Sequence, residues 1–324
     1  RAIEAGFELE SFQRRLHVDA VYYNKKTTDL LAYVHNIGSF DALLNQGSIR
    51  NNGVELSASW RQPVNKDFEV TLAGNFTTYK SKVLELANNG TPIINNASII
   101  QVGAPVGAFY GYIVEGVYQS YADKLASPVN TDFSYGPGDF KYKDVNGDGI
   151  ISSLDRTIIG DPTPDFAYGG SVNVKYKGFD LGLDFGGVYG NEIYRMWGGT
   201  ESPFQRVNYP QFKINRWHGA GTSNWDPILG QGHRINYEYS TYGIEDGSYF
   251  RLRNIQAGYN FSNALISKIR LKSLRLFANV QNLKTWKNNL GYSPEFGGDG
   301  LQFGVDRAGN AIPMVTTFGI NVNF

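Results

Sequence analysis

"FEVTLAGNFTTY", residues 68–79, decides the fold, because apolar side chains recur in it at every second position. Phe68, Val70 and Leu72 fall on one side of an extended chain, and polar residues such as Asn75 fall on the other. This period of two predicts a β-strand with one apolar and one polar face.

The same alternation recurs along the chain and predicts an all-β protein of about ten strands. It is found in "RLHVDAVYY" (15–23), "GVELSASWR" (53–61), "FAYGGSVNVKYK" (166–177), "FDLGLDFGG" (179–187), "SLRLFANVQN" (273–282) and "TFGINVNF" (317–324). In "YFRLRNIQAGYNF" (249–261) the apolar residues change register, which predicts a β-bulge near Asn254.

Strand length and connection length separate two architectures with this pattern. The segments run to roughly 9–13 residues, which suits tilted transmembrane strands better than soluble ones. Short turns such as Lys177-Gly178 alternate with long Gly-, Asn- and Pro-rich stretches at 82–105, 118–164, 195–245 and 284–312. Short turns on one rim and long loops on the other favour a transmembrane antiparallel β-barrel. A soluble β-sandwich remains the alternative.

Composition excludes several classes of function. The 324 residues carry 30 Lys plus Arg and 30 Asp plus Glu, so a strongly basic surface for nucleic acid is not expected. The chain has no Cys, which excludes disulfides and a thiol nucleophile. No nucleophile elbow and no phosphate-binding loop is found. We therefore predict neither an enzyme nor an organic cofactor.

"DVNGDGIISSLD" (144–155) has the spacing of a calcium-binding loop. The ligand positions are filled by Asp144, Asn146, Asp148, Ile150 through its carbonyl, and Asp155, with Ser152 acting through water. Flanking glycines and proline exclude the helices of an EF-hand. The sequence predicts a structural Ca²⁺ in the long loop 118–164, and a solvated acidic turn is the alternative.

Other candidate ligand residues are aromatic or are histidines. Flat aromatic faces can stack on sugar rings, and the sequence offers Tyr194, Trp197, Trp217 and Trp225, with Phe204 between them. Packing within the loop is the alternative role for all of them. The histidines are His17, His35, His218 and His233, and none forms a pair with helical metal-ligand spacing.

Several long, ordered motifs resemble the SusC-like outer-membrane transporters of the Bacteroidetes, a branch of the TonB-dependent receptors. The longest is "GDFKYKDVNGDGIISSLDRTIIGDPTPDFAYGGSVNVKYKGFDL" (138–181). The others are "VYYNKKTTDLL" (21–31), "IRNNGVELS" (49–57), "VGAPVGAFYGY" (102–112), "EDGSYFRLRNIQAGYNF" (245–261), "VQNLKTWKNNLGYSPE" (280–295) and "TTFGINVNF" (316–324).

The resemblance implies a fold and a function for residues 1–324. The family fold is a 22-stranded barrel filled by an N-terminal plug, and this chain resembles its C-terminal part, so we expect the plug to lie upstream. The function implied is TonB-dependent import of large nutrients, glycans or peptides, across a Gram-negative outer membrane. The partners implied are a SusD-like surface lipoprotein, TonB, and the lipid and lipopolysaccharide of that membrane. A structural barrel component without transport and a soluble glycan-binding domain are the alternatives.

The C-terminus supplies one further candidate site. Phe318, Ile320, Val322 and Phe324 lie in register at the end of the last alternating segment. In the family such a terminal aromatic strand resembles the signal that the outer-membrane insertion machinery recognises. A chain that simply ends on Phe is the alternative.

Overall fold

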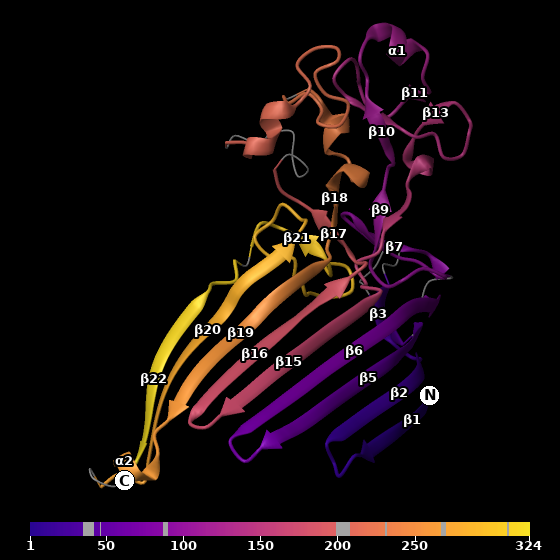
Figure 1. Ribbon diagram of the computed structural model, residues 1–324. Coiled ribbons are helices and arrows are strands. Elements are labelled where there is room, and N and C mark those ends of the chain that lie inside the picture. Colours follow the sequence, from indigo (N-terminus) through magenta and orange to yellow (C-terminus); the bar gives the residue numbers. More distant parts are fainter. Residues whose placement is uncertain are drawn as a thin grey trace.

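The computed structural model describes residues 1–34, 42–45, 47–86, 90–198, 208–230, 232–266, 270–309 and 311–324. His35 and Phe204 lie outside these ranges. The main element is a nine-stranded sheet, called the wall below, in the order β1-β2-β5-β6-β15-β16-β19-β20-β22 (Figure 1). Its strands are β1 (Ala2–Ser11), β2 (Leu16–Thr27), β5 (Ser48–Asn65), β6 (Phe68–Glu85), β15 (Phe166–Tyr176), β16 (Phe179–Tyr189), β19 (Tyr249–Asn260), β20 (Ser273–Lys287) and β22 (Val315–Asn323).

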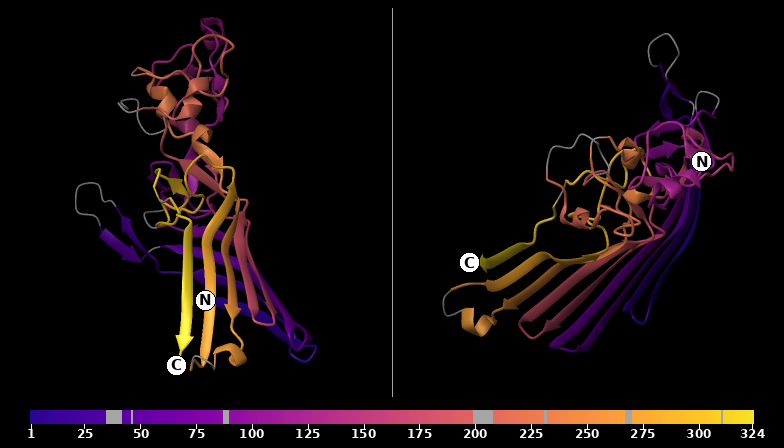
Figure 2. Two further views of the ribbon diagram at one scale, coloured as in Figure 1. Left: turned by 60° about the vertical axis from the view of Figure 1, so that its left-hand side comes forward. Right: turned by 90° about the horizontal axis from the view of Figure 1, so that it is seen from above.

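Every wall strand pairs antiparallel with its neighbour, so the wall is an up-and-down meander. It curves through an arc from β1 to β22 (Figure 2), and these two strands are its edges within the described residues. The all-β antiparallel architecture expected from the alternation is confirmed. The expected bulge is confirmed too, because the pairing of β19 with both neighbours shifts between Leu252 and Asn254.

The connections differ at the two ends of the wall. At the lower end in Figure 1, tight turns join β1 to β2, β5 to β6 and β15 to β16, and the short helix α2 (Asn263–Ile266) lies between β19 and β20. At the upper end lie the connections 28–47, 86–165, 190–248 and 288–314. The expected loop 118–164 forms the second part of the connection 86–165. Short strands within residues 108–117 separate it from the first part of that connection.

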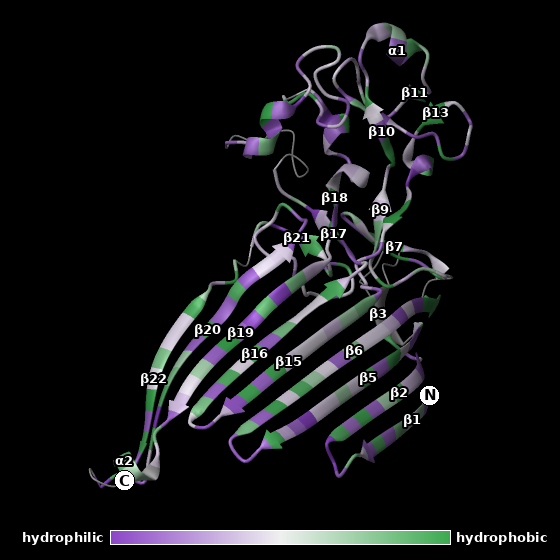
Figure 3. Cartoon of the chain, viewed as in Figure 1, coloured by the Kyte–Doolittle hydropathy of each residue, from purple (hydrophilic) through white to green (hydrophobic). Residues whose placement is uncertain are grey.

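One face of the wall carries the apolar side chains of every strand. Residues that pair directly across strands share a face, and the hydropathy of neighbouring residues alternates along each strand (Figure 3). One such row is Trp60, Leu72, Val172, Leu183 and Ile255. Many of these side chains remain exposed, including Phe7 at 61% and Phe318 at 80%.

Two belts of aromatic side chains border this apolar face. Toward the tight turns, the rings of Phe68 and Tyr176 lie 6.0 Å apart and those of Phe179 and Tyr259 lie 4.5 Å apart. Toward the long connections the belt contains Phe76, Phe166, Tyr189, Phe250 and Trp286. From Phe68 to Phe76 the strand is about 27 Å long, at about 3.4 Å per residue.

None of the helices in the described ranges is long and apolar enough to cross a membrane.

The long connections 86–165, 190–248 and 288–314 pack together into a layer above the wall, called the loop layer below (Figure 1). Its strands are β7 (Ile93–Asn95), β8 (Ser98–Ile100), β9 (Ala108–Gly111), β10 (Val114–Val117), β11 (Val129–Asn130), β12 (Phe140–Tyr142), β13 (Ile150–Ile151), β14 (Thr157–Gly160), β17 (Glu192–Arg195), β18 (Ile244–Asp246) and β21 (Val305–Asp306). Its helices are α1 (Tyr121–Leu125) and the 3-10 turns η2 (Ser153–Asp155), η3 (Gln211–Asn215), η4 (Arg234–Tyr237) and η5 (Thr241–Gly243). The connection 28–47 contains the hairpin of β3 (Leu31–Val34) and β4 (Ala42–Asn45).

Candidate functional site

The polar face of the wall contains a hollow of about 590 Å³ across its central strands. Small side chains form the floor, among them Ser57, Ala73 and Ser171. Gly187 also lines the hollow, and glycine is required there because a Cβ would lie 1.9 Å from the backbone oxygen of Tyr249. The floor therefore stays wide and shallow, with polar groups and little side-chain bulk.

Charged groups border the hollow and the rest of the polar face. At one border Asp184 accepts a hydrogen bond of 3.0 Å from Asn254, at the bulge of β19. Nearer the tight turns, Arg275 donates to Asp180 at 2.6 Å across two strand pairings. These groups are hydrogen-bonded and partly exposed, as expected on a surface that faces water rather than a dry core.

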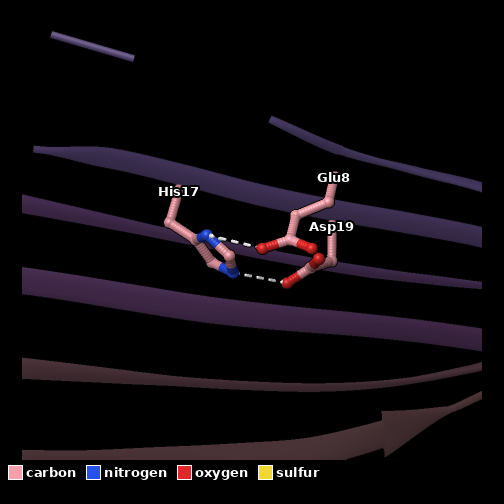
Figure 4. Close-up of side chains that lie close together, drawn as sticks. All are labelled: Glu8, His17 and Asp19. Carbon is pink, nitrogen blue, oxygen red and sulfur yellow. Dashed lines mark hydrogen bonds and ion pairs between the residues drawn. The ribbon is translucent and has the colours of Figure 1, made fainter. Parts of the chain in front are cut away.

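His17 borders the other side of the hollow, between two carboxylates (Figure 4). Its Nε2 lies 2.7 Å from Asp19 Oδ2, and its Nδ1 lies 3.8 Å from Glu8 Oε1. Ser57 donates to the same Asp19 oxygen at 3.3 Å. Glu8, His17 and Asp19 form the single group of three acidic or histidine side chains in the described ranges whose ligand atoms all lie within 4.8 Å.

Sequence reasoning treated His17 as an isolated polar group. The signal that it missed is the register of β1 on β2, which places Glu8 opposite Asp19 and Glu10 opposite His17. Alternation puts all four on one face, but only the pairing brings them together. The result is a hydrogen-bonded cluster that links β1, β2 and β5 on the polar face.

The loop layer has its own dry core, in contrast to the wall. The core contains Tyr112, Val117, Phe140, Tyr142, Ile151, Ile235 and Tyr242, drawn from two different connections. Burial raises the pKa of Tyr112 to about 12, so its hydroxyl stays protonated at neutral pH. The two longest connections are therefore one folded body rather than separate loops.

Buried polar contacts fix the two connections to each other. Asp139 is 2% exposed and accepts hydrogen bonds from His233 at 2.7 Å, Asn236 at 2.9 Å and the backbone of Gly136 at 2.8 Å. Burial raises the pKa of Asp139, against the lowering effect of His233. Because a buried carboxylate needs its hydrogen bonds, this contact favours one arrangement of the two connections.

The calcium-type loop is shaped by hydrogen bonds from its own backbone. Asp144 accepts from Gly147 at 2.6 Å and from Gly149 at 2.7 Å. Both of these glycines have positive φ, at 77° and 82°, which favours glycine at these turns. Asp148 accepts from the amide of Ile150 at 2.8 Å and from the side chain of Asn146 at 3.0 Å.

Asp155, at the last ligand position, is fully buried. Its two oxygens accept from Val145 and from Ser152, each at 2.8 Å, and with Ser152 it forms the capping box of η2. Asp155 therefore has a structural role in this loop, and the Ca²⁺ site of Asp144, Asn146, Asp148, Ile150 and Asp155 stays a prediction.

The four aromatic candidates lie in different surroundings. Tyr194 is 1% exposed in the core, where its hydroxyl accepts a hydrogen bond from the backbone of Ser240. Trp217 packs against the main core of the loop layer, and Trp197 donates to Asp306 at 2.8 Å. Trp225 is 50% exposed, with its ring 5.7 Å from that of Tyr242. Trp225 is thus the candidate whose ring reaches solvent most.

The C-terminal candidates lie on the apolar face of the last strand. Phe318 pairs with Ala278, and Ile320 pairs with Leu276. Phe318, Ile320, Val322 and Phe324 are 80%, 65%, 38% and 81% exposed. Their shared outward face is the one on which an assembly signal would be read, and that role stays a prediction.

A curved antiparallel wall with an apolar face between aromatic belts, a polar opposite face and long loops at one end defines part of a transmembrane β-barrel of the outer-membrane type. Residues 1–283 match the family described as TonB dependent receptor-like, beta-barrel, and the chain belongs to this family.

Curated relatives match nearly the whole chain. TonB-dependent receptor P3 of Formosa agariphila is 32% identical over 100% of this chain and 34% of its own length. TonB-dependent receptor SusC of Bacteroides thetaiotaomicron is 28% identical over 99% of this chain and 31% of its own length. The chain thus spans about a third of these relatives. The expected SusC-like resemblance is confirmed.

Solved structures show the same fold. The structure of the RagAB peptide transporter superposes with a TM-score of 0.82 at 21% identity, over 100% of this chain and 35% of that one. The RagAB peptide importer in its "open-open" state gives a TM-score of 0.80 at 22% identity, over 100% of this chain and 34% of that one.

Proposed function

We propose that this chain forms part of the barrel of a TonB-dependent importer in the outer membrane of a Gram-negative bacterium of the Bacteroidetes type. The observation that carries the proposal is the division of the wall into two faces. One face offers lipid an apolar band between two aromatic belts, and the other offers water a hollow bordered by hydrogen-bonded charges. A wall of this kind encloses an aqueous passage.

The cargo is a large hydrated nutrient, a glycan or a peptide. The floor of small side chains and the scattered charges suit a polar chain that slides past without tight binding. The structure of the RagAB peptide transporter supports a peptide cargo, and the glycan rests on the resemblance to the SusC-like family. The energy comes from TonB acting on the plug, while the wall itself carries out no covalent chemistry.

A SusD-like surface lipoprotein covers the loop layer. Supporting this partner, α1 and its neighbour β11 expose Tyr121 at 71%, Leu125 at 84% and Val129 at 55%. Exposed apolar side chains that cluster in this way mark interaction surfaces. The exposed apolar band of the wall opposes the alternative of a soluble glycan-binding domain, which would leave that band in water.

Two further parts of the proposal concern stability and assembly. A Ca²⁺ held by Asp144, Asn146, Asp148, Ile150 and Asp155 would stiffen the loop beneath such a partner. The ion would neutralise the negative charges of these carboxylates and would take part in no catalytic step. Phe324, together with the outward face of β22, would be the signal for insertion into the membrane.

The test of import is growth and uptake by a strain that lacks the complete gene. The deletion strain is supplied with panels of oligosaccharides and peptides that are too large for porins. We expect loss of uptake of one such cargo, restored by the gene in a tonB⁺ background and not in a tonB⁻ one. Uptake that is normal without the gene would overturn import and favour a structural barrel component.

The test of the partner is a pull-down from native outer membranes in detergent, with every band identified by mass spectrometry. We expect one lipoprotein to be recovered with the importer. Leu125→Glu should weaken that recovery, whereas Val64→Glu, at an exposed apolar position of β5 beside the tight turns, should not. Equal recovery by wild type and Leu125→Glu would exclude α1 as part of the contact.

A further inference from the structure

Four basic side chains form a row on the outer, apolar face of the wall, at its long-loop end. Lys26 of β2 pairs with Arg50 of β5, and Arg50 pairs with Lys82 of β6. Arg1 continues the row, because it exchanges both backbone hydrogen bonds with Lys26, each at 2.8 Å. Lys80 lies two residues from Lys82 and points to the same side.

The rows beneath these cations change in composition with depth. In order toward the middle of the wall they are Ile3–Asn24–Asn52–Lys80, then Ala5–Tyr22–Val54–Thr78, then Phe7–Ala20–Leu56–Phe76. Charge thus gives way to amides, then to small and mixed groups, then to apolar side chains. No acidic residue occurs in these four rows. The sequence of layers follows the depth of a bilayer leaflet from headgroup to hydrocarbon.

The cations in this row form no ion pair with any carboxylate in the part of the chain that the structure describes. Among the described residues, no carboxylate oxygen lies within 4.0 Å of the side-chain nitrogens of Lys26, Arg50, Lys80 or Lys82. Like charges directly opposite each other on neighbouring strands destabilise a sheet. A row of such pairs is therefore suited to binding an anion.

The neighbouring part of the same rim shows that the row is local. On β15, β16, β19 and β20 the outer positions nearest this rim carry Phe166, Tyr189, Phe250 and Trp286, and the register of β15 on β6 places Phe166 level with Thr78, below the cations. The aromatic belt extends onto β6 at Phe76, and β20 carries Lys284 on this face. Among the described wall strands, however, cations pair directly with one another on the outer face only in the row of Arg1, Lys26, Arg50 and Lys82.

We propose that the row of Lys26, Arg50 and Lys82, with Arg1 and Lys80 beside it, binds the phosphorylated sugar headgroup of lipid A in the outer leaflet. This inference rests on the outer-membrane location in the proposed function and names a lipid partner for the outer face of the wall. Arg50 can hold a phosphate through two parallel N–H groups, and the lysines add point charges on either side. Asn24 and Asn52, one row deeper, supply amide hydrogen bonds for sugar oxygens.

The occupant is a lipid rather than a soluble anion because of where the row lies. The side chains directly below it, from Tyr22 and Val54 to Phe7 and Phe76, are 37–61% exposed and apolar. A headgroup on the cations would place its acyl chains along these side chains. Free phosphate would use the cations and leave the apolar rows bare.

The experiment uses the complete protein, purified from outer membranes in mild detergent and titrated with bisphosphorylated lipid A, with bound lipid counted by native mass spectrometry. The triple variant Lys26→Gln/Arg50→Gln/Lys82→Gln should bind about a hundredfold more weakly, at a factor of about five per cation near a membrane surface. The matched control is Lys25→Gln/Lys66→Gln/Lys177→Gln. It removes equal charge from the other face of β2 and from the tight turns, and it should bind as wild type does.

Two arms need no multiple variant, so the test stands even where the triple fails to assemble. Lipid A with both phosphates removed should bind wild type about as weakly as the triple binds intact lipid. Lys80→Gln alone should weaken binding about fivefold. Equal binding of both lipids, or an equal loss in the control triple, would overturn the inference. Competition by millimolar inorganic phosphate that abolishes lipid binding would identify a free-anion site instead.

These outcomes are separate from those of the import test. Binding is measured in detergent on purified protein and requires neither TonB nor cargo. A protein that fractionates with the outer membrane and does not import can still bind lipid A, and an importer can fail to bind it.

Discussion

The wall leaves its large apolar side chains exposed, whereas the loop layer above it buries its own. Phe179 and Phe318 of the wall are 61% and 80% exposed, while Tyr118 and Phe140 of the loop layer are 1% and 0% exposed. The wall is built to be completed by lipid, and the loop layer is completed by its own packing. The same residue types thus stabilise the two regions through different surroundings, and substitutions in them should have different consequences.

The largest expected effect is in the core of the loop layer. Phe140→Ala removes a fully buried ring that packs against Tyr142 and Tyr242. We expect the loop layer to lose about 3–5 kcal/mol of stability through the transfer and cavity terms. Hydrogen exchange of the loop-layer amides in the complete protein measures the loss. Tyr121→Ala, at an aromatic residue that is 71% exposed, is the control and should change little. Equal protection in the two variants would mean that the loops are not one packed body.

The next effect sharpens the difference between the two faces of the wall. Leu72 lies midway between the aromatic belts of β6, and Ala73 beside it lines the polar hollow. Leu72→Arg should cost about 2–4 kcal/mol at the middle of a bilayer, whereas Ala73→Arg, in water, should cost far less. Heat-modifiable gel migration of the membrane-extracted protein measures the folded fraction. A greater loss for Ala73→Arg would reverse the assignment of the faces.

The third effect concerns the metal predicted for the loop layer. Ca²⁺ at a hundred times its Kd should stabilise the loop layer by about 2.7 kcal/mol, and a chelator should remove that gain. Asp144→Asn/Asp148→Asn should abolish the response to Ca²⁺. Asp132→Asn, an exposed change in the same connection, should retain it. A wild-type protein whose thermal unfolding ignores both Ca²⁺ and chelator would leave the loop as a hydrogen-bonded acidic turn.

The sequence predicts the wall well and the loop layer poorly, for one physical reason. Wall strands repeat every two residues, so Phe68, Val70 and Leu72 report their face without knowledge of any partner. The register shift at Asn254 was visible as a break in the same pattern. Lys26, Arg50 and Lys82 lie outside the alternating segments 15–23, 53–61 and 68–79, so the sequence pattern does not place them in strands. Their meeting depends on the pairing of β2, β5 and β6.

The loop layer depends on contacts between distant residues that have no local period. Asp139 meets His233 and Asn236 across two connections, and Tyr194 is buried although its sequence resembles an exposed aromatic loop. The cluster of Glu8, His17 and Asp19 was missed for the same reason, since it needs the register of β1 on β2. Where side chains from several segments converge, spacing along one segment carries too little information.

The smallest expected effect is on how the stability of the loop layer depends on pH. It distinguishes the loop layer from the wall, because the group responsible, Glu238, lies in the loop layer. Burial raises the pKa of Glu238 above its ordinary 4.5, against the lowering effects of Arg156 and Arg234. The folded state therefore holds this proton more tightly than the unfolded state does. Its contribution to stability is fully present below about pH 4.5 and is lost as pH rises through the higher folded pKa.

Glu238→Gln should flatten that part of the pH profile and stabilise the loop layer slightly at pH 7. Glu115→Gln, at an exposed position of β10, is the control. Profiles of hydrogen exchange that stay parallel for Glu238→Gln and wild type would show that Glu238 is compensated by its arginines.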